Sequence, residues 1–446
     1  MNQRVTLAGF LWLCFSLSQT SLAQTGPNNT DTTPAGTIAI IGGKLLTITH
    51  GTIENGVVVM SAGKIIAVGP AASTNVPKDA HIFDAKGMTV YPGLFDAETR
   101  LGLTEVEADA NSNDLIETSD EIMPHMHVAD AFHAESVRIP VARLNGITNA
   151  IVAPASEDSI AGQDAAIQLY GRDRDAMLIR RDIALAMNFD GSVRRKGSDD
   201  GSSKFPTTRM GLASQIRQAF LDAQSYEAEM QAAAKPDHKG NPPKRDLKLE
   251  ALLPYLKGEK PVVLGATEGY EVEVAMEIAK EFKLKVILNH VTHAQNILDE
   301  IASYHVPVIV GPIYDAPLPS ERYDAVYSLP AELQKRGVKI AFSSLGGSGD
   351  NRNLPYAAGY SVAYGLPYDE ALKAITLNPA EMFGFGDSLG SLDVGKTANV
   401  VIANGDPLDV RTSVKQVFIN GEAIPMVSRQ TQLRDQYMPL TDNKKN

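Results

Sequence analysis

Two short segments carry side chains whose types and spacing suit a site that binds an ion or a ligand. Glu98 and Arg100 stand two residues apart at the end of an apolar run, so on a β-strand both side chains face the same way. Asn289 and His290 end a second apolar run. A carboxylate or an imidazole can bind a metal ion, whereas a guanidinium has no lone pair and stays protonated. We therefore expect an ion pair between Glu98 and Arg100, which is either structural or presents a fixed donor fork to an anionic or carboxylate ligand.

Other residues offer alternative chemistry. Ser343 and Ser344 follow the last apolar run, and a serine nucleophile there would need His290 as its base. His125 and His127 have the spacing of a metal-binding pair, but they lie in a loop that enters a helix. The glycine-rich segment 346–349 is either an anion-binding loop or a flexible one. A relocated metal site would join His290 to carboxylates at strand ends, namely Glu98, Glu268, Asp315 and Asp350.

These candidates must be positioned by a sheet whose strands alternate with helices. Helix-period stretches separate most of the strand-like runs, which is the rhythm of a parallel α/β sheet. Eight such strands predict a closed (β/α)8 TIM-like barrel, in which chemistry sits where strands end and loops begin. The strand-like runs are 89–95, 149–153, 166–169, 177–179, 262–264, 286–288, 308–310 and 339–342. The helix-period stretches are 128–144, 209–230, 271–282, 294–304 and 329–336.

The two ends of the chain have a different texture from the middle. Short β-branched runs separated by glycine turns fill residues 37–90 and recur in residues 388–424. We expect these two segments to form one small β-sandwich beside a barrel of residues 91–387. Residues 425–446 are expected to be a polar tail.

The first residues have the pattern of a secretory signal peptide. Arg4 precedes a mostly apolar run over residues 5–17, and residues 21–23 end in a small-x-small cleavage pattern. We predict a signal peptide over residues 1–23, a linker over 24–36, export to the periplasm and no stable membrane anchor. The single cysteine, Cys14, lies inside the apolar run, so the mature chain would contain no disulfide.

Composition excludes several classes of protein. The chain has 446 residues, of which 43% are hydrophobic and 21% charged, and its mean hydropathy is −0.12. Those values fit neither a disordered polymer nor a protein with many membrane spans. Lys and Arg number 41 against 53 Asp and Glu, a net charge of −12, which would repel a phosphate backbone. We therefore expect no nucleic-acid partner.

A series of short motifs in order resembles the amidohydrolase superfamily of metal-dependent hydrolases. Residues 92–96 form the Pro-Gly-apolar-apolar-Asp pattern that this superfamily places before His-x-His on its first barrel strand. The resemblance runs from about residue 37 to residue 423 and is nearest to the imidazolonepropionase-like and prolidase-like branch. It implies a barrel flanked by a sandwich, and hydrolysis of carbon–nitrogen bonds. Further matching segments are 145–149, 206–211, 374–380, 389–396 and 404–408.

The chain departs from this superfamily at the metal ligands. Glu98-Thr99-Arg100 stands in place of His-x-His, Gly265 follows the fifth strand where a ligand is expected, and only His290 is kept. Leu345 or a neighbouring serine replaces the aspartate of the eighth strand, and the bridging lysine is missing near Ala186 and Met187. A catalytic zinc site needs about three protein ligands plus water, so we expect no metal cofactor unless a relocated site holds zinc or another divalent ion.

Three functions remain open from the sequence. The chain is a hydrolase of carbon–nitrogen bonds with an altered site, or a noncatalytic protein that binds a small peptide or amino-acid derivative, or a subunit that pairs with a ligand-complete relative. A homo-oligomer is a further expectation. His290 is the predicted metal ligand if a metal is bound. The predicted ligand-binding residues are Glu98, Arg100, Asn289, His290 and Ser344.

Overall fold

The computed structural model describes residues 36–190, 205–345 and 350–442. The predicted signal peptide, most of the linker and the segment 346–349 lie outside these residues. The middle of the chain forms one eight-stranded sheet whose strands lie in chain order. These strands are β6 (Leu94–Thr99), β7 (Ile147–Val152), β8 (Ile160–Gln168), β9 (Leu178–Asn188), β10 (Pro261–Gly265), β11 (Lys285–Asn289), β12 (Val308–Val310) and β13 (Ile340–Phe342).

Each strand-like run of the sequence overlaps one strand of this sheet, but the sheet is not wholly parallel. Strand β8 runs antiparallel to both β7 and β9. Only the loop 153–159 separates β7 from β8, and a loop with the short helix α3 (Arg174–Met177) separates β8 from β9. These links are too short for the crossover helix that parallel neighbours require, so the expectation of an all-parallel sheet was wrong here.

The sheet curls into a nearly closed barrel. Its edge strands β6 and β13 approach each other where the backbone N–H of Ser344 donates a hydrogen bond of 3.0 Å to Oδ1 of Asp96. One end of the barrel interior is filled by apolar side chains, including Phe95, Ile151 and Phe385. The polar candidates at the carboxyl ends of the strands therefore lie above a closed hydrophobic floor.

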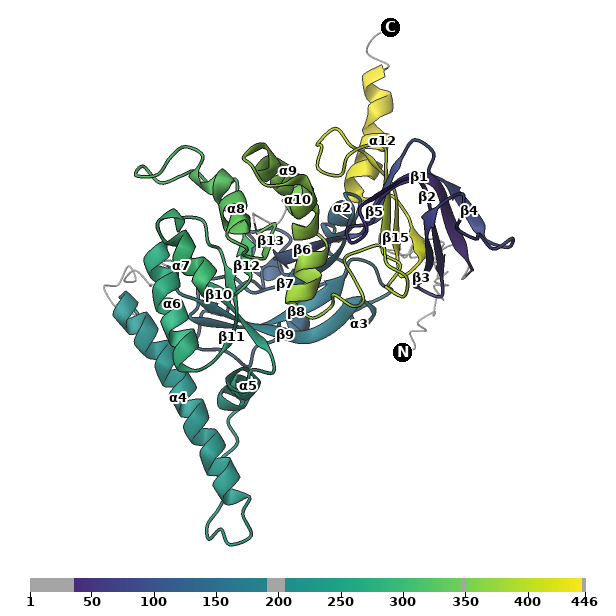
Figure 1. The fold of residues 1–446 in the computed structure, drawn as a ribbon. Helices are drawn as coiled ribbons and strands as arrows, with labels where there is room; N and C mark the ends of the chain where they lie inside the picture. The colour runs from purple at the N-terminus through teal and green to yellow at the C-terminus, as the bar shows by residue number, and fades with distance from the viewer. Residues whose placement is uncertain (1–35, 191–204, 346–349, 443–446) are drawn as a thin grey trace, which may run out of the picture.

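Helices line the outside of the second half of the sheet, as Figure 1 shows. The stretch 128–144, expected as one helix, is divided into α1 (Val128–Ala131) and α2 (Ile139–Arg143). Pro140 lies in the first turn of α2, where its missing N–H costs nothing, and it would break a helix that passed through it. The helices of the second half are α6 (Gly269–Glu281), η3 (Gln295–Ile297), α7 (Leu298–Ser303), α8 (Ala325–Lys335), η4 (Asn351–Asn353), α9 (Leu354–Ala363), α10 (Tyr368–Ala374) and α11 (Leu377–Met382).

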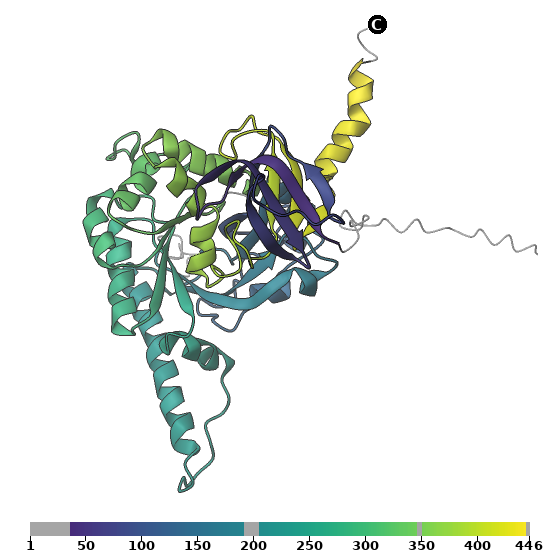
Figure 2. The same ribbon diagram turned by 45° about the vertical axis from the view of Figure 1, so that its right-hand side comes forward.

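A pair of helices projects from the barrel. Helix α4 (Arg209–Ala233) packs against α6 near its start and then extends away from the sheet, and α5 (Leu247–Leu256) returns beside it (Figures 1 and 2). A short η1 (Ala110–Ser112) lies in the loop after β6. No helix of the described residues is long and apolar enough to cross a membrane.

Both ends of the chain meet in a second sheet. Strand β14 pairs antiparallel with β5, with Val401 opposite Tyr91, so the early and late segments share one sheet as expected. Its closure into a sandwich stays a prediction. The expected polar tail forms the helix α12 (Arg429–Asp442), which points away from the body in Figure 1. The strands of this sheet are β1 (Ile38–Leu46), β2 (Thr52–Ser61), β3 (Lys64–Pro70), β4 (His81–Asp84), β5 (Thr89–Pro92), β14 (Val400–Ala403), β15 (Val414–Ile419) and β16 (Glu422–Ile424).

Candidate functional site

A buried carboxylate, Glu98, is the centre of a polar cluster at the open end of the barrel. Its Oε2 lies 3.2 Å from Nε2 of His290 and accepts a hydrogen bond from Nδ2 of Asn289. Its Oε1 lies 3.9 Å from Nη2 of Arg100. The structure thus brings together four of the five predicted ligand-binding residues, from strands β6 and β11, and places Glu98 and Arg100 on the same face as the strand spacing predicted.

The surroundings of Glu98 keep it ionised. Burial raises the pKa of this carboxyl. His290, Arg100 and the hydrogen bond from Asn289 together lower the pKa by more than burial raises it, so the net pKa lies below its usual value. The side chain is 5% exposed. A negative charge is therefore held in the barrel by its neighbours rather than by solvent.

The glycine that replaces an expected ligand makes room for the cluster. Gly265 ends β10 and lies beside Asn188 on β9 and Asn289 on β11. A β-carbon at Gly265 would lie 2.5 Å from Oδ1 of Asn188 and 3.3 Å from Nδ1 of His290. The structure therefore places Asn188, rather than Ala186 or Met187, at the strand end where the bridging lysine was sought.

His290 is held in an uncommon backbone conformation. Its φ is +60°, in the left-handed region that side chains other than glycine rarely adopt. The side-chain oxygen of Asn289 accepts a 2.9 Å hydrogen bond from the backbone N–H of His290, which fixes this turn. Such conformations persist where the surrounding contacts determine them, and they are common at binding sites.

Asp164, which the sequence patterns did not single out, also faces this cluster. Its neighbour Gln163 accepts a 3.1 Å hydrogen bond from Tyr255 on the outer side, so the alternation of β8 turns Asp164 inward. Burial, and secondarily the charge of Glu98, raise the pKa of Asp164 well above its usual value, although Arg100 lowers it. The sequence could have indicated Asp164 only if the strand had been recognised as beginning six residues before the run 166–169, because side chains then alternate between its two faces through position 164.

Ser344 belongs to a neighbouring network that ties the barrel together. Its hydroxyl donates to Oδ2 of Asp96 and accepts a 3.0 Å hydrogen bond from Nδ2 of Asn351, which also donates to Thr99. Burial raises the pKa of Asp96 to about 7, against the lowering effect of the bonds from Ser344. Because Ser344 Oγ is directed to Asp96, no His290–Ser344 nucleophile pair is formed.

The remaining sequence candidates do not join the cluster. His293, three residues after His290, has its Nδ1 2.8 Å from Oε2 of Glu321 and is not part of the cluster either. Glu268 forms the capping box of α6 with Glu271. Of the proposed carboxylate set, Asp315 is close enough to His290 and His293 for these to lower its pKa, although burial raises it overall. His125 keeps a buried Nδ1 without a hydrogen-bond partner among the described residues.

The residues present do not fit the metal that such a barrel would imply. Over residues 36–190, 205–345 and 350–442, no group of three His, Cys, Asp or Glu side chains is arranged to hold a metal ion. The guanidinium of Arg100 stands beside Glu98, and a fixed cation repels a second one. The geometry suits hydrogen bonding to a ligand better than metal coordination.

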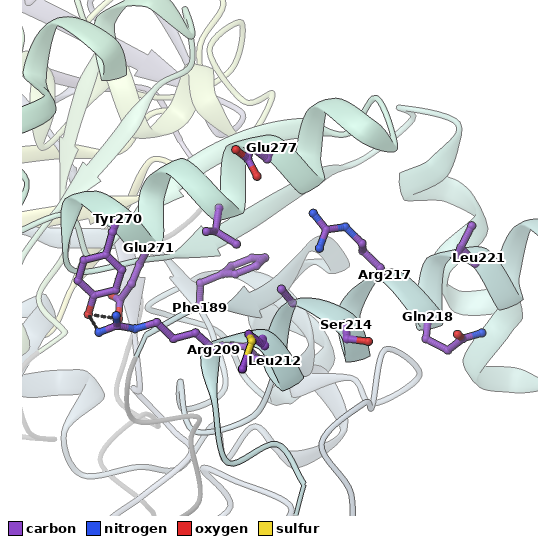
Figure 3. Close-up of a pocket in the computed structure, with 13 residues that line it drawn as sticks. Phe189, Arg209, Leu212, Ser214, Arg217, Gln218, Leu221, Tyr270, Glu271 and Glu277 are labelled. Carbon is purple, nitrogen blue, oxygen red and sulfur yellow. Dashed lines mark hydrogen bonds between the residues drawn. The ribbon is translucent and has the colours of Figure 1, made fainter.

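A pocket of about 590 Å³, whose lining does not include the residues of the cluster, lies between α4 and α6 (Figure 3). Both of its arginine side chains are engaged with neighbouring groups. The guanidinium of Arg209 lies 3.6 Å from the ring centre of Tyr270, and Nε of Arg217 lies 2.7 Å from Oε2 of Glu281. This groove carries no group of residues set up for chemistry.

The fold is an eight-stranded α/β barrel with a polar cluster at its strand ends and a second sheet built from both chain ends. This combination defines a class of barrel proteins, and known proteins can be compared with this chain on that basis. Residues 258–424 match the model of the amidohydrolase family. An amidohydrolase structure from Thermotoga maritima superposes with a TM-score of 0.79 at 27% identity, covering 88% of this chain and 100% of that one. This chain is therefore similar to amidohydrolases in the sequence of residues 258–424 and in the fold of its barrel.

Two further relatives show how far the likeness extends. Amidohydrolase tasK of Hapsidospora irregularis is 25% identical over 374 residues, which are 79% of this chain and 38% of that protein, so the chain spans about two fifths of this curated relative. A prolidase structure in complex with N-methylphosphonate-L-proline has a TM-score of 0.53 at 17% identity and covers 89% of this chain, which shows a shared fold.

Proposed function

We propose that the chain takes up a small amide or short peptide-like molecule at the open end of its barrel, the class of molecule whose carbon–nitrogen bonds amidohydrolases cleave. The match of residues 258–424 to the amidohydrolase family supports this class of molecule. The cluster of Glu98, Asn289 and His290 carries the proposal, because it lies at strand ends where barrel proteins bind their ligands. These side chains supply both donors and acceptors for an amide group.

We further propose that binding here is not followed by metal-assisted hydrolysis. Glu98 and His290 supply two ligand groups where about three are needed, and Arg100 adds a positive charge beside them. A protein that keeps the barrel of a hydrolase but holds its ligand without cleaving it agrees with these replacements. Hydrolysis of a carbon–nitrogen bond is the second candidate, and the family match favours it.

One experiment separates the two candidates. The purified chain is incubated with a panel of dipeptides and N-acylated amino acids, with and without zinc, and both binding and product release are measured. Binding without product in either condition supports the proposal. Multiple turnovers that require zinc establish the hydrolase instead, and the absence of binding to every compound contradicts both. His290→Gln should abolish binding, whereas His305→Gln, at an exposed position, should not.

We also propose that the chain is exported to the periplasm. The charged start, the apolar run over residues 5–17 and the small residues at 21–23 support this. Expression of the full chain with its natural start, followed by cell fractionation, should give a periplasmic protein whose first residue is Gln24. Retention of residues 1–23 in the cytoplasmic fraction would contradict it.

The replaced ligand positions suggest a partner. Because Arg100 and Gly265 stand where the resemblance implies metal ligands, we propose that this chain works as a homo-oligomer or beside a related amidohydrolase with a complete ligand set. Light scattering of the purified chain tests the first arrangement, and co-purification with a tagged relative from the same cells tests the second. A monomer that captures no relative contradicts both.

A further inference from the structure

The guanidinium of Arg100 is buried with few polar contacts. Its side chain is 11% exposed. Within the described parts of the chain, the carboxylate of Glu98 at 3.9 Å is its sole ion-pair or hydrogen-bond partner, and Nη1 is buried without a hydrogen-bond acceptor. A guanidinium has five N–H donors, and burying them without hydrogen-bond acceptors reduces the stability of the fold. The fork of Arg100 is therefore free to bind an acceptor.

Glu98 does not use up this fork. Its Oε2 is already engaged by Asn289 and faces His290 at 3.2 Å. Its Oε1 lies 3.9 Å from Arg100, beyond the range of a hydrogen bond between a guanidinium and a carboxylate. The two residues thus attract each other as charges but are not joined in the bidentate arrangement that satisfies a guanidinium.

Asp164 carries a hydrogen-bond acceptor that complements the donors of Arg100. It is 1% exposed, and its Oδ1 has no hydrogen-bond partner among the described residues. The sheet register places it at the level of Arg100, because Thr99 lies opposite Val152 and Val152 lies opposite Ala165. Glu98 and Arg100 are its electrostatic neighbours. Burial raises the pKa of this carboxyl well above its usual value, which opposes an ion pair with Arg100, and a carboxyl group keeps an acceptor oxygen in either protonation state.

We infer that Arg100 and Asp164 form a subsite for an N-acyl amino acid or a peptide C-terminus, in which the guanidinium receives the ligand carboxylate and Oδ1 of Asp164 accepts the adjacent amide N–H. A planar carboxylate matches the guanidinium fork. The neighbouring amide supplies the donor that the buried Oδ1 lacks. This inference rests on the proposed function and names the ligand class within it.

The test compares ligands that differ only in charge. Each N-acetyl amino acid of a panel is paired with its carboxamide, and the affinities of both for the full mature chain are measured by calorimetry. The acid should bind at least tenfold more tightly than the amide, in every pair where binding is seen. Equal affinity for acid and amide overturns the inference but leaves the proposed function standing. No binding by either form overturns both.

A variant locates the preference. Arg100→Gln should bring the affinity for the acid down to that for the amide, while Arg100→Lys, which keeps the charge without the fork, should keep part of the preference. Arg172→Gln, at a side chain that is 91% exposed, is the charge-matched control and should keep the full preference. An acid preference that survives in Arg100→Gln overturns the assignment, and circular dichroism confirms that each variant is folded.

Discussion

Nε2 of His290 lies 3.2 Å from Oε2 of Glu98, and both side chains are more than nine-tenths buried. This contact joins the ends of β6 and β11 across the interior of the barrel. It also leaves Arg100 as the cation that balances Glu98 on its other side. The site is therefore a set of linked charges, and changing one of them should alter the rest.

Glu98→Gln should destabilise the fold by about 3–5 kcal/mol, because it leaves the buried guanidinium of Arg100 without the one carboxylate that it pairs with among the described residues. Urea unfolding at neutral pH measures the change. The control is Glu54→Gln, which removes an exposed ion pair with Lys44 at 3.4 Å and should cost less than about 1 kcal/mol. Equal losses in the two variants would show that Arg100 does not depend on Glu98.

Because of Asp96, the free energy of unfolding should fall as pH rises from about 4 to 7. Its folded pKa of about 7 lies above the usual value of 3.8, so the folded state keeps a proton that the unfolded state has released in this range. Stability from this group is thus complete below the usual pKa and falls by up to about 1.4 kcal/mol per pH unit until the folded pKa is reached.

Asp96→Asn removes this titration and should reduce the slope of stability against pH. Urea unfolding of both proteins at several pH values between 4 and 8 measures the difference between their profiles. Asp79→Asn, at an exposed position, should leave the natural slope unchanged. Parallel profiles for the natural chain and Asp96→Asn would show that Asp96 ionises alike in both states.

Much of the fold could be predicted because the apolar runs of the barrel are local patterns. The runs at 262–264, 286–288 and 308–310 lie within β10, β11 and β12. The reversed direction of β8 was missed, although the link 170–176 between the runs 166–169 and 177–179 is too short for the crossover helix that parallel neighbours require. Direction depends on which strands pair, and that is a property of the whole sheet.

Site residues were predicted where their spacing on a strand sets which way they face. They were missed where their position depends on burial in the folded sheet. Two residues of separation on a strand placed Glu98 beside Arg100, and the apolar run before Asn289 placed His290 at the barrel end. Asp164 was missed because β8 begins well before its apolar run, so its alternating positions were not recognised. The bond between Ser344 and Asp96 joins the two edges of the sheet, and no local pattern encodes it.

Gly265→Ala should destabilise the protein by about 1–3 kcal/mol and weaken ligand binding, because the new β-carbon would lie 2.5 Å from Oδ1 of Asn188. Its cost is steric. Gly51→Ala is the contrasting control, since open space surrounds that position but its φ is +72°, so it should cost about 1 kcal/mol through the backbone alone and leave binding intact. Normal ligand affinity in Gly265→Ala would show that this glycine does not shape the site.

Zinc binding by a histidine variant can show whether Arg100 stands where a metal ion would be held. A tetrahedral zinc ion with bonds of about 2.0–2.1 Å keeps its nitrogen ligands roughly 3.3 Å apart. The 3.2 Å between Oε2 of Glu98 and Nε2 of His290 is close to that spacing. The double variant Glu98→His with Arg100→His should therefore gain three imidazoles around one point and retain about one zinc ion per chain after dialysis and desalting, measured by elemental analysis.

The single variant Glu98→His is the matched control, because it offers two imidazoles but keeps the guanidinium beside them. It should retain little zinc, as should the natural chain, since a fixed cation at this distance opposes a divalent one and two ligands do not complete a site. Zinc bound by the double variant alone would mean that the positively charged side chain of Arg100 prevents this barrel from holding a metal ion. Near-stoichiometric metal in the natural chain would mean instead that Arg100 moves aside, and the ligand fork proposed for it would be lost.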